Sequence, residues 1–145
     1  MERCEQLLPE EVLARATLVG SEYAWPLTDI PMVIEAAKIA NLLNIGGQLQ
    51  FRGPEIGIWE CYWVEVDTYK EIDPNLPWTE RVSAAANVAL SQFKHICAKY
   101  DFIAEVRSGF AKHLAAFEAQ GGNVDKALCF VWYVEGQHGR TLSAK

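Results

Sequence analysis

The chain has 145 residues, of which 50% are hydrophobic and 11% aromatic, and its formal net charge at pH 7 is −6. This length suits one domain of about 100 to 150 residues, and so much apolar material argues against intrinsic disorder. An acidic chain lacks the basic surface that direct nucleic-acid binding requires. No apolar run reaches the ~20 residues of a membrane-spanning helix, so we expect no membrane partner.

The start of the chain and its cysteines both indicate a cytoplasmic protein. Residues 1–5 include two glutamates, and no apolar segment typical of a secretory signal follows them. Cys4, Cys61, Cys97 and Cys129 are widely spaced and form no C-x-x-C pair. We therefore predict that the last three are reduced residues packed in the core.

Two helices are predicted in the first 47 residues. Pro9 and the two glutamates after it are typical of a helix start, and the glycine at position 20 can end that helix. After an aromatic connector, Thr28 or Asp29 caps a second helix with a broad apolar stripe. Residues 44–47, which include Gly46 and Gly47, are predicted to end it.

A β-hairpin follows. Residues 48–52 alternate polar and apolar side chains, as a half-buried strand does. Residues 53–57 have the composition of a turn, and residues 58–67 form the second predicted strand.

The C-terminal half predicts two helices and a strand. A long helix runs from about Pro77 to Tyr100, and Asp101 caps another that ends at residues 121–122. Residues 127–134 are a continuous apolar run, which predicts a strand buried on both faces at the centre of the sheet. A buried helix is the alternative for this run.

These elements predict an α+β fold in the order α-α-β-β-α-α-β. A small three-stranded sheet, made of the β-hairpin and the C-terminal strand, is covered by about four helices. We expect residues 1–136 to form a single α+β domain and residues 137–145 to be a flexible, polar C-terminal tail.

The sequence contains no H-E-x-x-H, Walker or G-x-S-x-G motif. We therefore predict no catalytic residue, no metal and no cofactor, and favour a non-enzymatic role. The alternative is a small-ligand-binding or hydrolytic enzyme domain that uses carboxylates of the hairpin strand. Period two places Glu65 and Asp67 on one face with Trp59 and Trp63, whereas Glu60 points the opposite way.

The charge is uneven, because residues 1–77 carry a net −8 and residues 78–145 a net +2. An acidic half would steer a basic partner, and tryptophan rings are typical anchors of protein interfaces. The predicted partner-binding residues are two tryptophans and the acids of the hairpin and the loop after it: Trp25, Trp59, Glu55, Glu65, Asp67, Glu71 and Asp73.

In its small size, acidity and aromatic content, the chain resembles bacterial toxin-neutralising immunity proteins. That resemblance implies an inhibitor that neutralises a basic partner protein such as a toxin. A homodimer is a further alternative, because a second copy could cover the apolar surfaces of the second helix and the hairpin.

Overall fold

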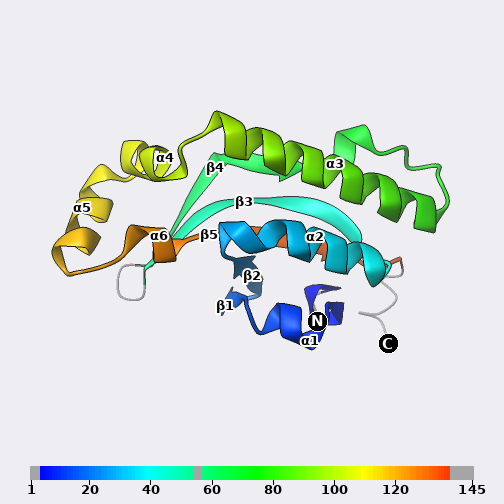
Figure 1. Ribbon diagram of the computed structural model, residues 1–145, viewed down its shortest axis with the longest axis horizontal. Coiled ribbons are helices and arrows are strands. Elements are labelled where there is room, and N and C mark those ends of the chain that lie inside the picture. Colours follow the sequence, from blue (N-terminus) through cyan, green and yellow to red (C-terminus); the bar gives the residue numbers. More distant parts are fainter. Residues whose placement is uncertain (1–3, 54–56, 138–145) are drawn as a thin grey trace.

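A computed structural model describes residues 4–53 and 57–137 of the chain. In that part, five strands form one antiparallel sheet in the order β1-β2-β5-β3-β4. Helices α2 and α3 pack against each other and lie across one face of this sheet (Figure 1). The described part contains no helix with the length and apolar character needed to cross a bilayer.

The elements follow one another as short 3-10 helices, α-helices and strands. In chain order they are η1 (Cys4–Leu7), α1 (Glu10–Leu13), β1 (Thr17–Val19), β2 (Glu22–Trp25), η2 (Leu27–Asp29), α2 (Ile30–Ile39), β3 (Leu43–Gly53), β4 (Gly57–Asp67), η3 (Tyr69–Glu71), α3 (Trp78–Lys99), α4 (Phe102–Gly109), α5 (Ala111–Ala119), α6 (Val124–Ala127) and β5 (Leu128–Glu135).

The predicted α+β class is confirmed, but the predicted numbers of strands and helices are wrong. The described residues form five strands and six α-helices, where we expected three strands and about four helices in the order α-α-β-β-α-α-β. The division into a domain of residues 1–136 and a tail of residues 137–145 stays a prediction, since residues 138–145 lie outside the described part.

The first predicted helix is the main error. The helix observed there, α1, already ends at Leu13. Strand β1 (Thr17–Val19) follows it and pairs with β2 (Glu22–Trp25) as a second hairpin. Gly20 lies in the turn between these strands with φ of 62°. Residues 17–19 are β-branched or aliphatic, so pairing with a neighbouring strand outweighed the helical spacing of the apolar side chains.

Gly46 and Gly47 were predicted to end the second helix, and this prediction is wrong. Both glycines lie inside β3. A Cβ atom on Gly47 would lie 1.6 Å from the carbonyl oxygen of Val131 in β5. Gly46 has φ of 139°, and a Cβ there would lie 1.9 Å from the carbonyl oxygen of Val66 in β4. The two glycines therefore let the backbones of three strands approach closely.

The hairpin of β3 and β4 and the central position of the last strand are confirmed. Strand β5 lies between β2 and β3, and Leu128 to Trp132 are all buried, so the buried-helix alternative is wrong. The Phe130 ring meets Phe93 of α3 edge to face with centroids 5.4 Å apart. Its neighbour Val131 belongs to a small buried cluster on the other face of the sheet.

The helix predicted after Asp101 also differs in part. The Asp101 side chain does cap it, accepting a hydrogen bond from the Ala104 backbone N–H at 3.1 Å. The helix is broken at Phe110, whose φ of −137° and ψ of 44° separate α4 from α5. The Phe110 ring stacks on Trp59 of β4, so packing against the sheet accompanies the break.

One buried side-chain amide connects strand β3 with helix α2 and strand β5. Asn44 of β3 is fully buried, and its Nδ2 donates to the Ile34 carbonyl of α2 at 3.1 Å. Its Oδ1 accepts from Nε1 of Trp132 in β5 at 2.8 Å. Its own backbone carbonyl accepts from the Thr68 hydroxyl at 2.8 Å, which fixes the start of the loop after β4.

Replacing Asn44 with Ala should lower the free energy of unfolding by about 2–4 kcal/mol, because the buried Trp132 N–H and Ile34 carbonyl both lose a partner. Urea denaturation would measure this. The matched control is Asn87→Ala on the exposed side of α3, which should change stability by less than about 0.5 kcal/mol. Equal effects of the two substitutions would contradict the role given to Asn44.

Candidate functional site

Three large aromatic side chains are exposed along β4 and the turn after it. Strand β4 lies at the edge of the sheet, and Tyr62, Trp63 and Tyr69 are 67%, 46% and 84% exposed. Large rings normally contribute buried area to a core. Rings grouped at an exposed edge are therefore candidates for contact with another molecule.

A β-bulge explains why two of these rings leave the core. Gln48 of β3 pairs with Glu65, but the next residue, Leu49, pairs with Cys61. Residues 62–64 consequently have no partner in β3. Such a bulge bends the strand and redirects its side chains.

The two aromatic side chains in the bulge, Tyr62 and Trp63, contact different neighbours. Trp63 lies against α4, where its Nε1 donates to the Glu105 carboxylate at 2.7 Å. Tyr62 hydrogen-bonds to Glu60, and that bond with the nearby negative charge raises the pKa of the Tyr62 phenol. Glu60 also accepts from Nε2 of Gln50 at 3.1 Å, so its carboxylate is held against the face of the sheet opposite the helices.

Three of the predicted acids belong to the same strand and turn as these rings. Glu65, Asp67 and Glu71 are all exposed. The Gln92 side chain of α3 accepts from the Asp67 backbone N–H at 2.8 Å and donates to the Asp67 carbonyl at 2.9 Å. Gln92 also donates to the Glu71 carboxylate, so α3 holds two of the acids in place.

The other two predicted acids are not part of this group. Asp73 is exposed further along the loop, where its carboxylate accepts from the Asn75 backbone N–H at 2.9 Å. Glu55 lies outside the described residues. We use the name β4 edge surface for the exposed rings and acids that β4 and the turn after it contribute, which are Tyr62, Trp63, Glu65, Asp67, Tyr69 and Glu71.

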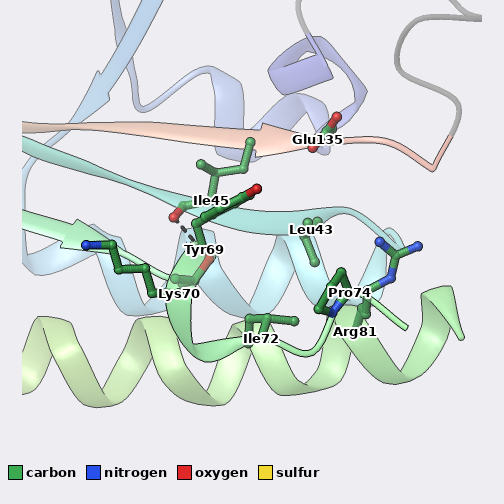
Figure 2. Close-up of a pocket in the computed structure, with 9 residues that line it drawn as sticks. Leu43, Ile45, Tyr69, Lys70, Ile72, Pro74, Arg81 and Glu135 are labelled. Carbon is green, nitrogen blue, oxygen red and sulfur yellow. Dashed lines mark hydrogen bonds between the residues drawn. The ribbon is translucent and has the colours of Figure 1, made fainter. Parts of the chain in front are cut away.

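The loop after β4 also forms one wall of a groove of about 450 Å³ (Figure 2). The first residues of β3, the end of β5 and the first turn of α3 supply the other walls. Tyr69 lines this groove and belongs to the β4 edge surface as well, so the two features adjoin.

Trp59, a predicted anchor, is occupied by packing within the fold. Its ring stacks on Phe51 with centroids 4.8 Å apart and on Phe110 at 5.9 Å. The His113 imidazole lies 4.9 Å away. Because helix α5 and the loop before it already contact this ring, we leave Trp59 out of the proposed surface.

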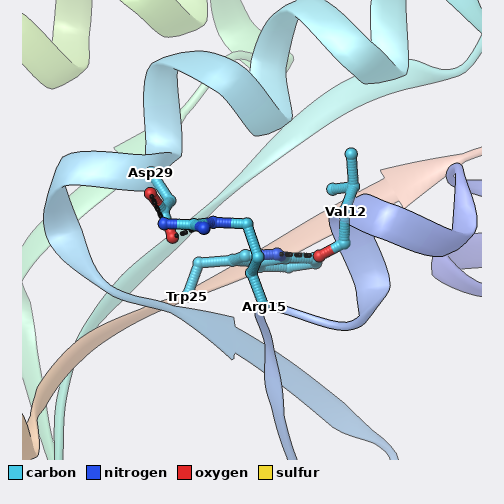
Figure 3. Close-up of polar contacts among 4 residues, drawn as sticks. All are labelled: Val12, Arg15, Trp25 and Asp29. Carbon is cyan, nitrogen blue, oxygen red and sulfur yellow. Dashed lines mark hydrogen bonds and ion pairs between the residues drawn. The ribbon is translucent and has the colours of Figure 1, made fainter.

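Trp25, the other predicted anchor, is fully buried. Its Nε1 donates to the Val12 carbonyl of α1 at 2.8 Å (Figure 3). Beside it, the Arg15 guanidinium donates to both carboxylate oxygens of Asp29 at 2.9 Å each. A ring enclosed in this way holds α1 and β2 together and does not reach a partner.

Glu60, Glu65 and Asp67 are the carboxylates of the alternative prediction, a small-ligand-binding or hydrolytic enzyme domain. Their side chains do not converge on one site in the described structure. Glu65 lines a shallow hollow with Ser91 and His95 of α3, but no hydrogen bond joins the three side chains in the described structure. A serine nucleophile needs such a bond to its base. Glu60 is bonded to Gln50 on the sheet face away from the helices, and Asp67 accepts from the Tyr69 backbone N–H.

The residues described contain no group of three or more His, Cys, Asp and Glu side chains that could hold a metal ion. All four cysteines are free thiols. Cys61 and Cys129 are buried as predicted, and burial raises the pKa of each thiol to about 11. Cys97 was predicted to pack in the core and is instead exposed on α3.

Sequence patterning missed the exposed rings for an identifiable reason. Strict alternation along β4 places Tyr62 and Trp63 on opposite faces of a strand that is apolar on both sides. A bulge changes that pattern without a sequence signal. Tyr69, which directly follows the strand in a polar segment, was the one ring whose exposure could have been expected.

No protein-family model, curated protein or solved structure matches the chain. Its function must therefore be inferred from the residues and contacts described above.

Thiol labelling should distinguish the cysteines. At pH 8 and in the folded protein, iodoacetamide should modify Cys97 well before Cys61 and Cys129, because these two are buried and have a pKa near 11. Mass spectrometry of peptides over time would give the rates, and urea-unfolded protein is the control in which the three rates converge. Fast labelling of Cys61 or Cys129 in the folded chain would contradict the described packing.

Proposed function

We propose that this chain is a non-enzymatic protein-binding domain and that the β4 edge surface receives the partner. The observation that carries the proposal is the grouping of three exposed rings with three exposed acids on one edge strand and its following turn. Aromatic anchors surrounded by polar residues are typical of interface hot spots.

The charge of the surface indicates the chemistry of the partner. Glu65, Asp67 and Glu71 are exposed there, and Lys70 is the cation that the same turn contributes. A basic partner would be drawn to such a surface by long-range attraction, while the exposed rings, once covered by the partner, would slow its release. These properties fit the inhibitor role that the resemblance to immunity proteins implies, with a basic protein such as a toxin as the target.

Recognition through side chains suits this edge better than the addition of a strand. An added strand needs a continuous row of free backbone N–H and carbonyl groups. Here Gln92 occupies both backbone groups of Asp67, and the bulge at residues 62–64 interrupts the regular ladder. The partner is therefore expected to contact rings and carboxylates.

Co-expression with proteins encoded beside this chain, followed by affinity purification, would test the proposal. The double substitution Tyr62→Ser and Tyr69→Ser should weaken a captured complex at least about tenfold, since each removes an exposed ring. Ile39→Ser is the matched control, because Ile39 is 77% exposed on α2, away from β4. If no neighbouring protein binds, or if the control and the double variant behave alike, the proposal fails.

The negative charges should affect the association rate constant, whereas the rings should affect the dissociation rate constant. Glu65→Gln with Glu71→Gln should slow association several-fold at low salt and leave dissociation nearly unchanged. Surface plasmon resonance at about 0.02 and 0.5 M NaCl would measure both rates, and the difference between variants should shrink at high salt, where the charges are screened. An unchanged association rate at low salt would exclude a basic partner at this surface.

A further inference from the structure

We infer that the groove at the end of the sheet binds a small amphipathic carboxylate, a molecule with an apolar body and one negative charge. This groove adjoins the partner contact proposed above and shares Tyr69 with it. It can be tested with the isolated chain, so either proposal can fail without the other.

The shape of the groove suits a small molecule. Its volume of about 450 Å³ falls within the ~300–1,000 Å³ of typical ligand pockets. Figure 2 shows it closed by β3 on one side and by the loop of residues 69–74 on the other, with α3 below. The Thr68 hydroxyl donates to the carbonyls of Asn44 and Ile45 at 2.8 and 3.1 Å, so the two walls are fixed relative to each other.

Four of the nine residues that line the groove are aliphatic. Leu43 and Ile45 come from β3, and Ile72 and Pro74 come from the loop facing them. Ligand pockets are usually built in this way, with apolar walls and a few polar groups that fix orientation. These four side chains would bury the aliphatic or aromatic body of a ligand away from water.

Arg81, a cation that lines the groove, supplies a polar group that could bind the ligand. Arg81, in the first turn of α3, lies with its guanidinium carbon 5.0 Å from the centre of the Trp78 ring. Its Nε is buried and has no hydrogen-bond acceptor among the described residues. A buried donor without an acceptor is unfavourable, and the planar guanidinium matches the two oxygens of a carboxylate.

The remaining charges favour a single negative charge on the ligand. Lys70 lines the groove as a second cation, and Glu135 at the end of β5 lines it as an anion. Two cations and one carboxylate leave the groove with one net positive charge. A monoanion balances that charge, whereas a dianionic phosphate would be repelled by Glu135.

The test uses three probes that share one chain length, octanoate, 1-octanol and octylammonium, each below its micelle concentration. Binding is followed by the chemical shifts of the Leu43 and Ile45 methyl groups. Octanoate should bind at least about tenfold more tightly than either other probe, because only octanoate carries a negative charge and two oxygens that can pair with the Arg81 guanidinium. Equal affinities, tightest binding of octylammonium, or no shift with octanoate would overturn the inference.

Substitutions separate recognition of the carboxylate from packing. Arg81→Met should weaken octanoate binding about tenfold or more and change 1-octanol binding by less than about twofold, because methionine keeps an apolar contact with Trp78. Lys70→Met should weaken octanoate binding to a smaller extent. Lys112→Met on exposed α5 is the matched control and should have no effect.

Circular dichroism would show that each variant is folded. If Arg81→Met were unfolded, Arg81→Lys would replace it, and it should retain the preference for octanoate over octylammonium with reduced affinity. Loss of octanoate and 1-octanol binding together in a folded Arg81→Met protein would mean that Arg81 only shapes the groove, and would overturn its role in binding the carboxylate.

Discussion

The buried side chain of Asn44 is the constraint on which the arrangement of the molecule depends. A buried amide is costly unless its donors and acceptors are used. Here the amide binds one carbonyl of α2 and the indole of Trp132 in β5, while the Asn44 backbone binds the Thr68 hydroxyl. The helix layer, the centre of the sheet and the loop after β4 are therefore fixed by a single residue.

That loop serves both proposed surfaces. Tyr69 and Glu71 belong to the β4 edge surface, and Tyr69, Lys70 and Ile72 line the groove. Because the Thr68 hydroxyl anchors the loop to β3, the positions of Tyr69, Glu71 and the groove wall all depend on the same two hydrogen bonds. The partner surface and the small-molecule site are thus separate in chemistry but share a structural support.

Some elements could be predicted because their residues act locally. The hairpin of β3 and β4, the long α3 helix and the Asp101 cap all follow from alternation, helical spacing or one capping side chain. The central position of β5 follows from its uninterrupted apolar run. The first predicted helix was wrong because residues 17–25 gain more from pairing with each other and with β5 than from local helical preference.

The sequence by itself determined the α+β class, the apolar strand at the centre of the sheet and the acidic character of the segment around β4. Only the tertiary structure decided which side chains are available at the surface. The bulge at residues 62–64 exposes Tyr62 and Trp63, whereas contacts with distant elements enclose Trp25 and Trp59. Exposure depends on contacts between residues far apart in the chain, and neither composition nor spacing records those contacts.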